Sequence, residues 1–351
     1  MKTLYWIDDT HDEGKPPNEA ARKRLENGLK AKLQIEQIED REQFDKLLPT
    51  ITAVKTCGVI MDYQLTKVGK KGQMAFGTTW ASEIRAAQPT IPVIGISHER
   101  ERDIPKFRLE SFLAFFQRGV LLGASPPIGN LSALLTGYGE ICERGKRQGG
   151  KSGVDLMVNL IMPPPDVTDL IRAAIPAALR GSWDAESPHV AGRWLWHELQ
   201  GMPGLLFDEL GLATHLGLNL KGLQRACSRF AMARYEGAFA SDGRPRWWVG
   251  AIREIFEKQV GHQIVGPVSN ARVELLQAMR IKTDERDSLL SRPYGRKNST
   301  AVPDCVAYRD DEREDDHRVQ ASYDDTFVDD SDANAALGFE PRRLFSPNKG
   351  E

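Results

Sequence analysis

Short apolar runs alternate with helical patterns between Thr3 and about Cys142. A short apolar run bounded by polar or turn residues is typical of a buried strand, whereas apolar residues at every third or fourth position are typical of a helix. Strands are predicted at residues 4–7, 33–38, 58–61, 92–96 and 112–116. Because helical patterns separate these runs, we expect a five-stranded parallel sheet with helices on both faces, a doubly wound α/β fold.

Polar side chains follow three of the predicted strands. Asp8 and Asp9 come after the first strand, Asp62 after the third and Ser97 after the fourth. The carboxyl ends of parallel strands share one edge of a sheet, so these groups are expected to converge there. Clustered carboxylates repel one another and are tolerated mainly when a hard cation such as Mg2+ neutralises them. The alternative is an aspartate that caps the following helix beside two loop acids.

The segments WIDD, IMDYQL and VIGIS resemble, in this order, the receiver domain of response regulators over roughly residues 1–140. That family has an acidic pair after strand one, a phospho-accepting aspartate after strand three and Ser or Thr after strand four. The resemblance implies that Asp8, Asp9 and Asp62 bind Mg2+. It also implies that Asp62 accepts a phosphoryl group, with Ser97 donating a hydrogen bond to the product.

One position departs from the family pattern. Receivers have a lysine, followed by proline, after strand five, whereas FLAFFQRG offers Arg118. A guanidinium is a good donor to phosphate but does not have the shape of an ammonium group. The resemblance implies a sensor histidine kinase or a phosphotransfer protein as partner. A pseudo-receiver that signals by binding alone is the alternative.

The stretch GKRQGGKS at residues 145–152 matches the phosphate-loop pattern GxxxxGK[ST], and LLFDE at 205–209 resembles an acidic strand. A phosphate loop must follow a buried strand and open a helix, because the helix N-terminus presents amide donors to the phosphates. Here the preceding residues indicate the end of a helix. Residues 145–153 are therefore predicted to be a flexible basic linker, and an ATPase is the least favoured function.

Residues 154–282 are predicted to form a helical domain, with helices at 167–179, 189–199, 220–234, 247–260 and 269–279. Within it, residues 211–230 have the spacing of a helix-turn-helix with Gly217 in the turn. The expected core positions are Leu212, Ala213, Leu216, Leu218 and Leu223. The candidate DNA contacts are Lys221, Gln224, Arg225 and Arg229. Two ordinary packed helices are the alternative, which Gly222 favours because glycine weakens a helix.

The pair Trp247 and Trp248 allows a stacking platform for nucleic acid or, more commonly, an anchor in a core. Four widely spaced cysteines favour free thiols. Residues 283–351 are rich in acids and predict a partly disordered tail, in which 333–345 are expected to be ordered.

The net charge of −2 and the ordinary apolar share of 40% give no sign of a nucleic-acid or membrane protein as a whole. We expect a cytoplasmic two-component signalling protein that is not an enzyme. Its domains are a receiver at residues 1–144, the linker, the helical output domain and the tail. The alternatives are a phosphoryl sink or relay, as in some antiphage phosphorelays, a partner-binding pseudo-receiver and a DNA-binding transcriptional regulator.

Overall fold

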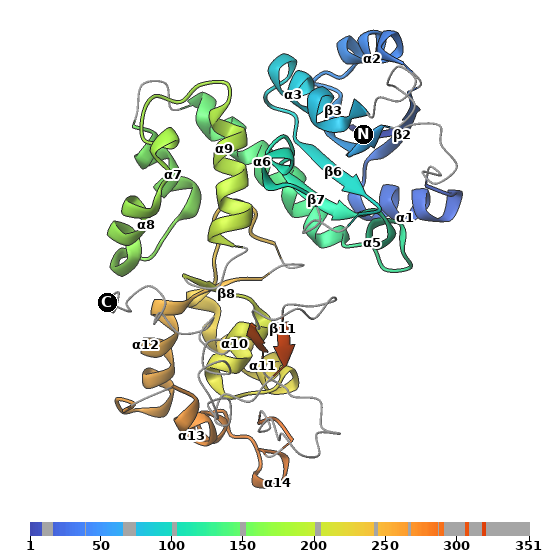
Figure 1. The fold of residues 1–351 in the computed structure, drawn as a ribbon. Coiled ribbons are helices and arrows are strands. Elements are labelled where there is room, and N and C mark those ends of the chain that lie inside the picture. The colour runs from blue at the N-terminus through green and yellow to red at the C-terminus, as the bar shows by residue number, and fades with distance from the viewer. Residues whose placement is uncertain are drawn as a thin grey trace, which may run out of the picture. The chain divides into compact units, whose positions relative to one another are not determined.

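The fold of the protein is given by a computed structural model (Figure 1). The structure describes residues 1–8, 17–38, 40–65, 75–99, 104–147, 152–200, 205–241, 245–265, 268–286 and 288–290, and two strands at 306–308 and 318–320. The described chain divides into two compact units. Unit 1 comprises Met1–Met162, Asp169–Glu198 and Glu236–Arg244, and unit 2 comprises Pro163–Thr168, Leu199–Tyr235 and Pro245–Glu351.

Unit 1 is built on a five-stranded sheet in the order β2-β1-β3-β6-β7. Every neighbouring pair in this sheet is parallel, as the sequence predicts. The strands are β1 (Thr3–Asp8), β2 (Lys32–Gln37), β3 (Thr56–Asp62), β6 (Val93–Ser97) and β7 (Ala114–Gln117). The strand order reverses between β1 and β3, and doubly wound sheets generally bind their ligands at the carboxyl ends of the strands at such a point.

Helices cover both faces of the sheet (Figure 1). On one face, α2 (Arg41–Leu47) and α3 (Gly77–Ala87) bury Phe44 against Trp80, whose rings stack with centroids 4.4 Å apart. On the other face lie α1 (Glu19–Leu29) and α6 (Ile128–Arg147). Asn18 caps α1 by accepting a hydrogen bond from the Ala21 backbone amide.

The division into units differs from the expected boundary after residue 144. The helix α6 runs to Arg147, and Ser152 caps α7 (Gly153–Ile161), so residues 145–147 and 153 of the predicted linker are helical. Both α7 and α9 (Ser187–Arg193) pack on α6 and belong to unit 1. A π-helix, η6 (Trp194–Leu199), continues α9. Sequence periodicity identified the helix at 189–199 but not α7, and it did not identify the surface that either of them covers.

Two further helices lie before α9. The predicted helix at 167–179 is divided into α8 (Thr168–Ala174) and a short 3-10 turn at Ala177–Leu179. Pro176 explains the break, because proline has no amide hydrogen to continue the helical ladder.

Unit 2 packs its helices around one apolar core. It also contains two short antiparallel strands, β8 (Leu206–Phe207) and β9 (Trp247–Trp248). A helix follows each of them in the chain. The helices are α10 (Glu209–Leu216), α11 (Leu220–Ala226), α12 (Val249–Val260), α13 (Arg272–Ala278) and α14 (Thr283–Arg286).

The expected start of the tail at residue 283 also differs from the structure. Leu289 is buried in the core of unit 2, and its carbonyl accepts a hydrogen bond from the Asn219 backbone at 3.0 Å. Farther on, β10 (Val306–Tyr308) pairs with β11 (Arg318–Gln320). The predicted ordered segment at 333–345 lies outside the described residues.

Candidate functional site at the carboxyl edge of the sheet

Four strand ends bring the predicted side chains to one edge of unit 1. Asp8 ends β1, Asp62 ends β3 and Ser97 ends β6. Arg118 begins the short helix α5 (Arg118–Leu122) directly after β7. All four side chains are buried, whereas the neighbouring Gln117 is exposed. Asp9 lies outside the described residues.

Arg118 bridges the two buried carboxylates. Its Nη1 atom donates to Asp62 Oδ2 at 3.1 Å, and its Nη2 atom donates to Asp8 Oδ2. Trp6 Nε1 donates to the same Asp8 oxygen at 3.1 Å, and the guanidinium carbon lies 5.7 Å from the centre of the Trp6 ring. The planar fork of arginine explains how one side chain reaches two carboxylates at once.

The electrostatics at Asp62 follow from burial. Removal from water and the neighbouring Asp8 carboxylate together raise the pKa of Asp62 to about 8, although the Arg118 cation acts to lower it. The backbone amide of Gln64 donates to Asp62 Oδ1 at 3.3 Å. Two buried acids and one cation carry a surplus negative charge, so a proton or a second cation at Asp62 is favoured.

Ser97 ends β6, the strand that pairs with β3, but its hydroxyl has a partner outside the Arg118 bridge. Its Oγ atom accepts a hydrogen bond from the Glu99 amide at 3.0 Å. The Gln64 side chain, in the segment after β3, donates to the carboxylate of Glu99, in the segment after β6, so these two segments are joined. The Tyr63 amide donates to the Ile96 carbonyl at 2.8 Å, which holds the two strand ends together.

The donor set suits a hard divalent cation only in part. Aspartate oxygens are ligands that Mg2+ accepts, and Asp8 and Asp62 present two of them side by side. Both Oδ2 atoms are already paired with Arg118. Within the described ranges, no group of three His, Cys, Asp or Glu side chains is arranged to hold a metal ion. A cation bound here would thus compete with Arg118 for the same oxygens.

Two residues of this site were missed at the sequence level. Trp6 stands two positions before Asp8, so strand alternation places both side chains on the same face of the sheet. This spacing was visible in the sequence. Gly77 begins α3 next to the end of β3, where an added Cβ atom would lie 2.0 Å from the Asp62 carbonyl oxygen. Glycine is required here for close approach, which sequence alone does not reveal.

In unit 2, α10 and α11 form the predicted helix pair. Gly217 lies between them with φ of +68°, and the predicted core positions are buried. The predicted DNA contacts Lys221, Gln224, Arg225 and Arg229 are exposed. Arg225 pairs with Glu285 at 2.7 Å and Arg229 donates to Gln259 at 3.2 Å. The surface formed by these four side chains is accessible to solvent, but part of its positive charge is paired with Glu285.

The tryptophans of unit 2 are core residues. Trp247 and Trp248 are 1% and 2% exposed, so neither presents a ring face for stacking on a nucleic acid. Gly222 has a structural reason as well, because an added Cβ atom would lie 2.3 Å from the Leu289 carbonyl oxygen. Cys57, Cys142 and Cys227 are free thiols, as expected, and Cys305 lies outside the described residues.

The candidate phosphate loop lacks the required setting. Gly145 lies in the last turns of α6, against the Trp183 side chain, and no strand leads into it within the described residues. Lys151 lies outside those residues. None of the helices in the described ranges has the length and apolar character needed to cross a bilayer.

Comparisons with known proteins add little to this geometry. No protein-family model and no curated protein matches the chain. Among solved structures, a response regulator protein from Burkholderia pseudomallei, with a phosphorylated aspartic acid, calcium ion and citrate, is similar over 45% of this chain and 91% of its own. The identity is 11% and the TM-score is 0.25. A score of this size carries no argument, so the doubly wound fold rests on the strand order.

Proposed function

We propose that unit 1 is a receiver-type signalling module in which Asp62 accepts a phosphoryl group and Arg118 supplies the neighbouring cation. The observation that carries the proposal is the buried bridge from Arg118 to Asp62 and Asp8 at the switch point of the sheet. The phosphoryl source is a phosphohistidine of a sensor kinase or a phosphotransfer protein. No catalysis beyond self-dephosphorylation is proposed.

In the proposed transfer, an oxygen of the ionised Asp62 carboxylate forms a bond to phosphorus. The P–N bond of the phosphohistidine breaks, and its electron pair stays on the imidazole, which leaves neutral when it was protonated at the other nitrogen. The oxygens of the transferred group carry negative charge that a guanidinium can pair with. Arg118 supplies that guanidinium, and the Ser97 hydroxyl supplies a further donor.

Mg2+ held by Asp8 and Asp62 would offset the charge of the phosphoryl oxygens and favour the ionised form of Asp62. The protein's own contribution is different. Burial keeps water from the Asp62 carboxyl, and the Gln64 amide fixes one of its oxygens at 3.3 Å. Arg118 must release at least one Oδ2 atom for the product to form.

A partner-binding pseudo-receiver is the second candidate. It is favoured by the same bridge, because Arg118 already pairs with both carboxylates without any added group. A DNA reader in unit 2 is favoured only by the exposed row on α11. Such a reader should bind duplex DNA in a salt-dependent way and lose affinity in Arg225→Ala.

Intact-mass analysis after treatment with phosphoramidate and MgCl2 tests the first proposal. We expect a gain of one phosphoryl group in the wild type and in Asp169→Asn, a matched change at an exposed aspartate of α8. The gain should disappear in Asp62→Asn and be retained in Arg118→Lys. A wild type that gains nothing from phosphoramidate or from a phosphorylated histidine phosphotransfer protein would leave the pseudo-receiver as the better reading.

A further inference from the structure

Three side chains on α9 and η6 contact the same turn of unit 1. His189, Arg193 and His197 are four residues apart and form what we call the carbonyl stripe. Spacing of this kind places side chains on one side of a helix. Each of them contacts backbone carbonyl oxygens of residues 109–113, the turn between α4 (Lys106–Leu109) and β7.

The contacts of the carbonyl stripe are short. Arg193 Nη1 donates to the Leu109 carbonyl at 2.7 Å and to the Phe112 carbonyl at 2.5 Å. His197 Nε2 lies 3.0 Å from the Leu113 carbonyl oxygen. Arg193 and His197 thus contact backbone carbonyl groups. Because every residue type has such a group, a substitution in the turn would not remove these acceptors.

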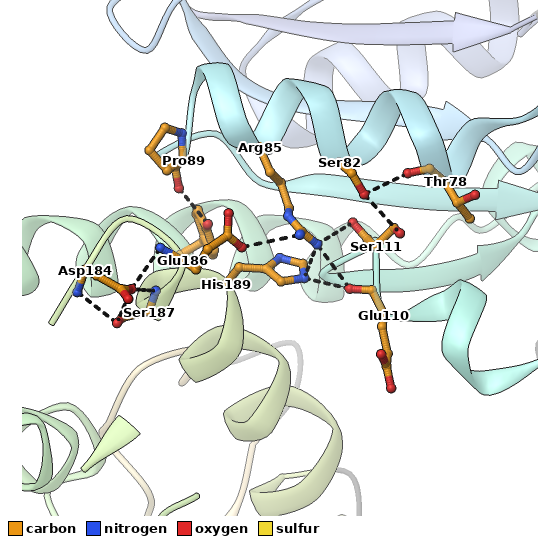
Figure 2. Close-up of polar contacts among 11 residues, drawn as sticks. Thr78, Ser82, Arg85, Pro89, Glu110, Ser111, Asp184, Glu186, Ser187 and His189 are labelled. Carbon is orange, nitrogen blue, oxygen red and sulfur yellow. Dashed lines mark hydrogen bonds and ion pairs between the residues drawn. The ribbon is translucent and has the colours of Figure 1, made fainter. Parts of the chain in front are cut away.

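His189 joins the stripe to α3 (Figure 2). Its Nε2 atom lies 2.8 Å from both Arg85 Nη1 and the Glu110 carbonyl oxygen. Burial and the Arg85 cation lower the pKa of His189 to about 3, so the ring is neutral. It donates to Glu110 or accepts from Arg85, depending on its tautomer. Arg85 Nη2 also donates to the Glu186 carboxylate at 3.3 Å.

The same turn is linked to the candidate site by two routes. Arg108 of α4 donates to the Tyr63 hydroxyl at 2.8 Å, and Tyr63 directly follows Asp62. The Leu113 amide donates to the Val93 carbonyl at 2.8 Å, and the turn then leads into β7, which ends beside Arg118. A hydrogen-bonded connection therefore runs from the segments that carry Asp62 and Arg118 to the turn.

The helix that carries the stripe is also where the chain leaves unit 1. Unit 1 includes residues up to Glu198, and unit 2 resumes at Leu199. Gly192 faces Leu113, and an added Cβ atom would lie 2.7 Å from the Leu113 side chain, so the helix sits directly on the turn. The π-helical geometry of η6 is a further unusual feature, of a kind often found at functional positions.

We propose that α9 and η6 are the output element of unit 1, which senses the position of the 109–113 turn through the carbonyl stripe. A change at the Asp62–Arg118 bridge moves the turn and loosens or tightens the helix that leads out of the unit. The proposal relies on the proposed function for its natural input. The contact itself does not depend on phosphorylation.

Hydrogen–deuterium exchange on the full chain, without any phosphoryl donor, tests the coupling. Asp62→Asn is isosteric and removes the carboxyl group that Arg118 pairs with, whereas Tyr63→Phe removes only the hydroxyl that Arg108 contacts. We expect each variant to change exchange in peptides covering 187–199 by about fivefold. Arg193→Ala should accelerate the same peptides directly. The control Arg172→Ala breaks a surface pair with Asp155 at 3.0 Å and should leave them unchanged.

Unchanged exchange at 187–199 in both Asp62→Asn and Tyr63→Phe would overturn the proposal and reduce the stripe to a packing contact. If Asp62→Asn fails to fold, Tyr63→Phe alone decides. Because all of these measurements use unphosphorylated protein, a chain that takes no phosphoryl group fails the mass experiment without affecting this result.

Discussion

The carboxyl edge of the sheet in unit 1 and the α10–α11 pair in unit 2 were both predicted from local sequence, and both are formed. They differ in what the fold does to their polar side chains. In unit 1 the groups are buried, and Asp8 and Asp62, from separate strands, both pair with Arg118. In unit 2 they remain on one helix surface and pair with neighbours such as Glu285. A parallel sheet brings polar side chains from separate strands together, whereas the spacing along a helix only places them on a common surface.

The two regions also differ in the free energy that is lost when a charged side chain loses its partner. A buried charge that loses its partner is costly because water cannot replace the partner, whereas an exposed charge is readily solvated. The side chains of Arg118 and Asp8 are 2% and 0% exposed, and those of Arg225 and Glu285 are 50% and 42% exposed. Substitutions in the two regions should therefore differ sharply in their effects.

The largest effect is expected for Arg118→Ala. The change leaves the Asp8 and Asp62 carboxylates buried without the cation that bridges them. We expect the free energy of unfolding to fall by about 3–5 kcal/mol, measured by urea denaturation of the full chain. Arg118→Lys, which keeps a cation, should recover part of this loss. An Arg118→Ala protein as stable as the wild type would show that the bridge contributes nothing.

Next in size is Gly77→Ala, at the start of α3. The new Cβ atom would meet the Asp62 carbonyl oxygen at 2.0 Å, so the strand end must shift. We expect a loss of about 1–3 kcal/mol, as for other overpacked sites. Gly222→Ala is the counterpart in unit 2, with a clash at 2.3 Å against the Leu289 carbonyl offset by the helix preference of alanine. It should therefore lose less stability than Gly77→Ala when both variants are unfolded in urea.

These glycines mark the limit of what the sequence predicted. The five strands, their parallel order and the positions of Asp8, Asp62, Ser97 and Arg118 followed from periodicity and from the family resemblance. The close approach at Gly77 and the docking of α9 on the 109–113 turn did not. Both depend on contacts between segments far apart in the chain, which local hydrophobic patterns do not encode. For the same reason, the sequence placed residues 154–162 and 169–198 in the helical domain at 154–282, whereas they belong to unit 1.

A third comparison sets buried His189 of unit 1 against exposed His262 of unit 2. Burial and Arg85 lower the pKa of His189 to about 3, so the unfolded chain binds a proton that the folded chain does not. Stability from this group is present above the unfolded pKa of about 6.5 and falls as the pH is lowered, by about 2 kcal/mol between pH 7 and pH 5. The His189→Gln variant should lack this part of the pH dependence of unfolding.

His262 should act in the opposite direction. The Gln263 carbonyl and the Glu274 carboxylate raise its pKa. Its contribution is therefore present at low pH and lost as the pH rises through the raised value. Comparing urea unfolding of His189→Gln and His262→Gln at pH 5 and pH 7 separates the two groups. Equal pH dependence in both variants would contradict the difference in burial.

The smallest effect is expected for Arg225→Ala in unit 2. Its ion pair with Glu285, 2.7 Å long, lies at the surface, and such pairs contribute at most about 1 kcal/mol. We expect urea unfolding of this variant to change by no more than that, and the change to shrink further at high salt because exposed charges are screened. Glu285→Gln should behave alike, since it removes the same pair from the other side. A loss as large as that of Arg118→Ala would mean that the 285–290 segment holds α11 through this pair, and the face would then be a structural contact rather than a free surface.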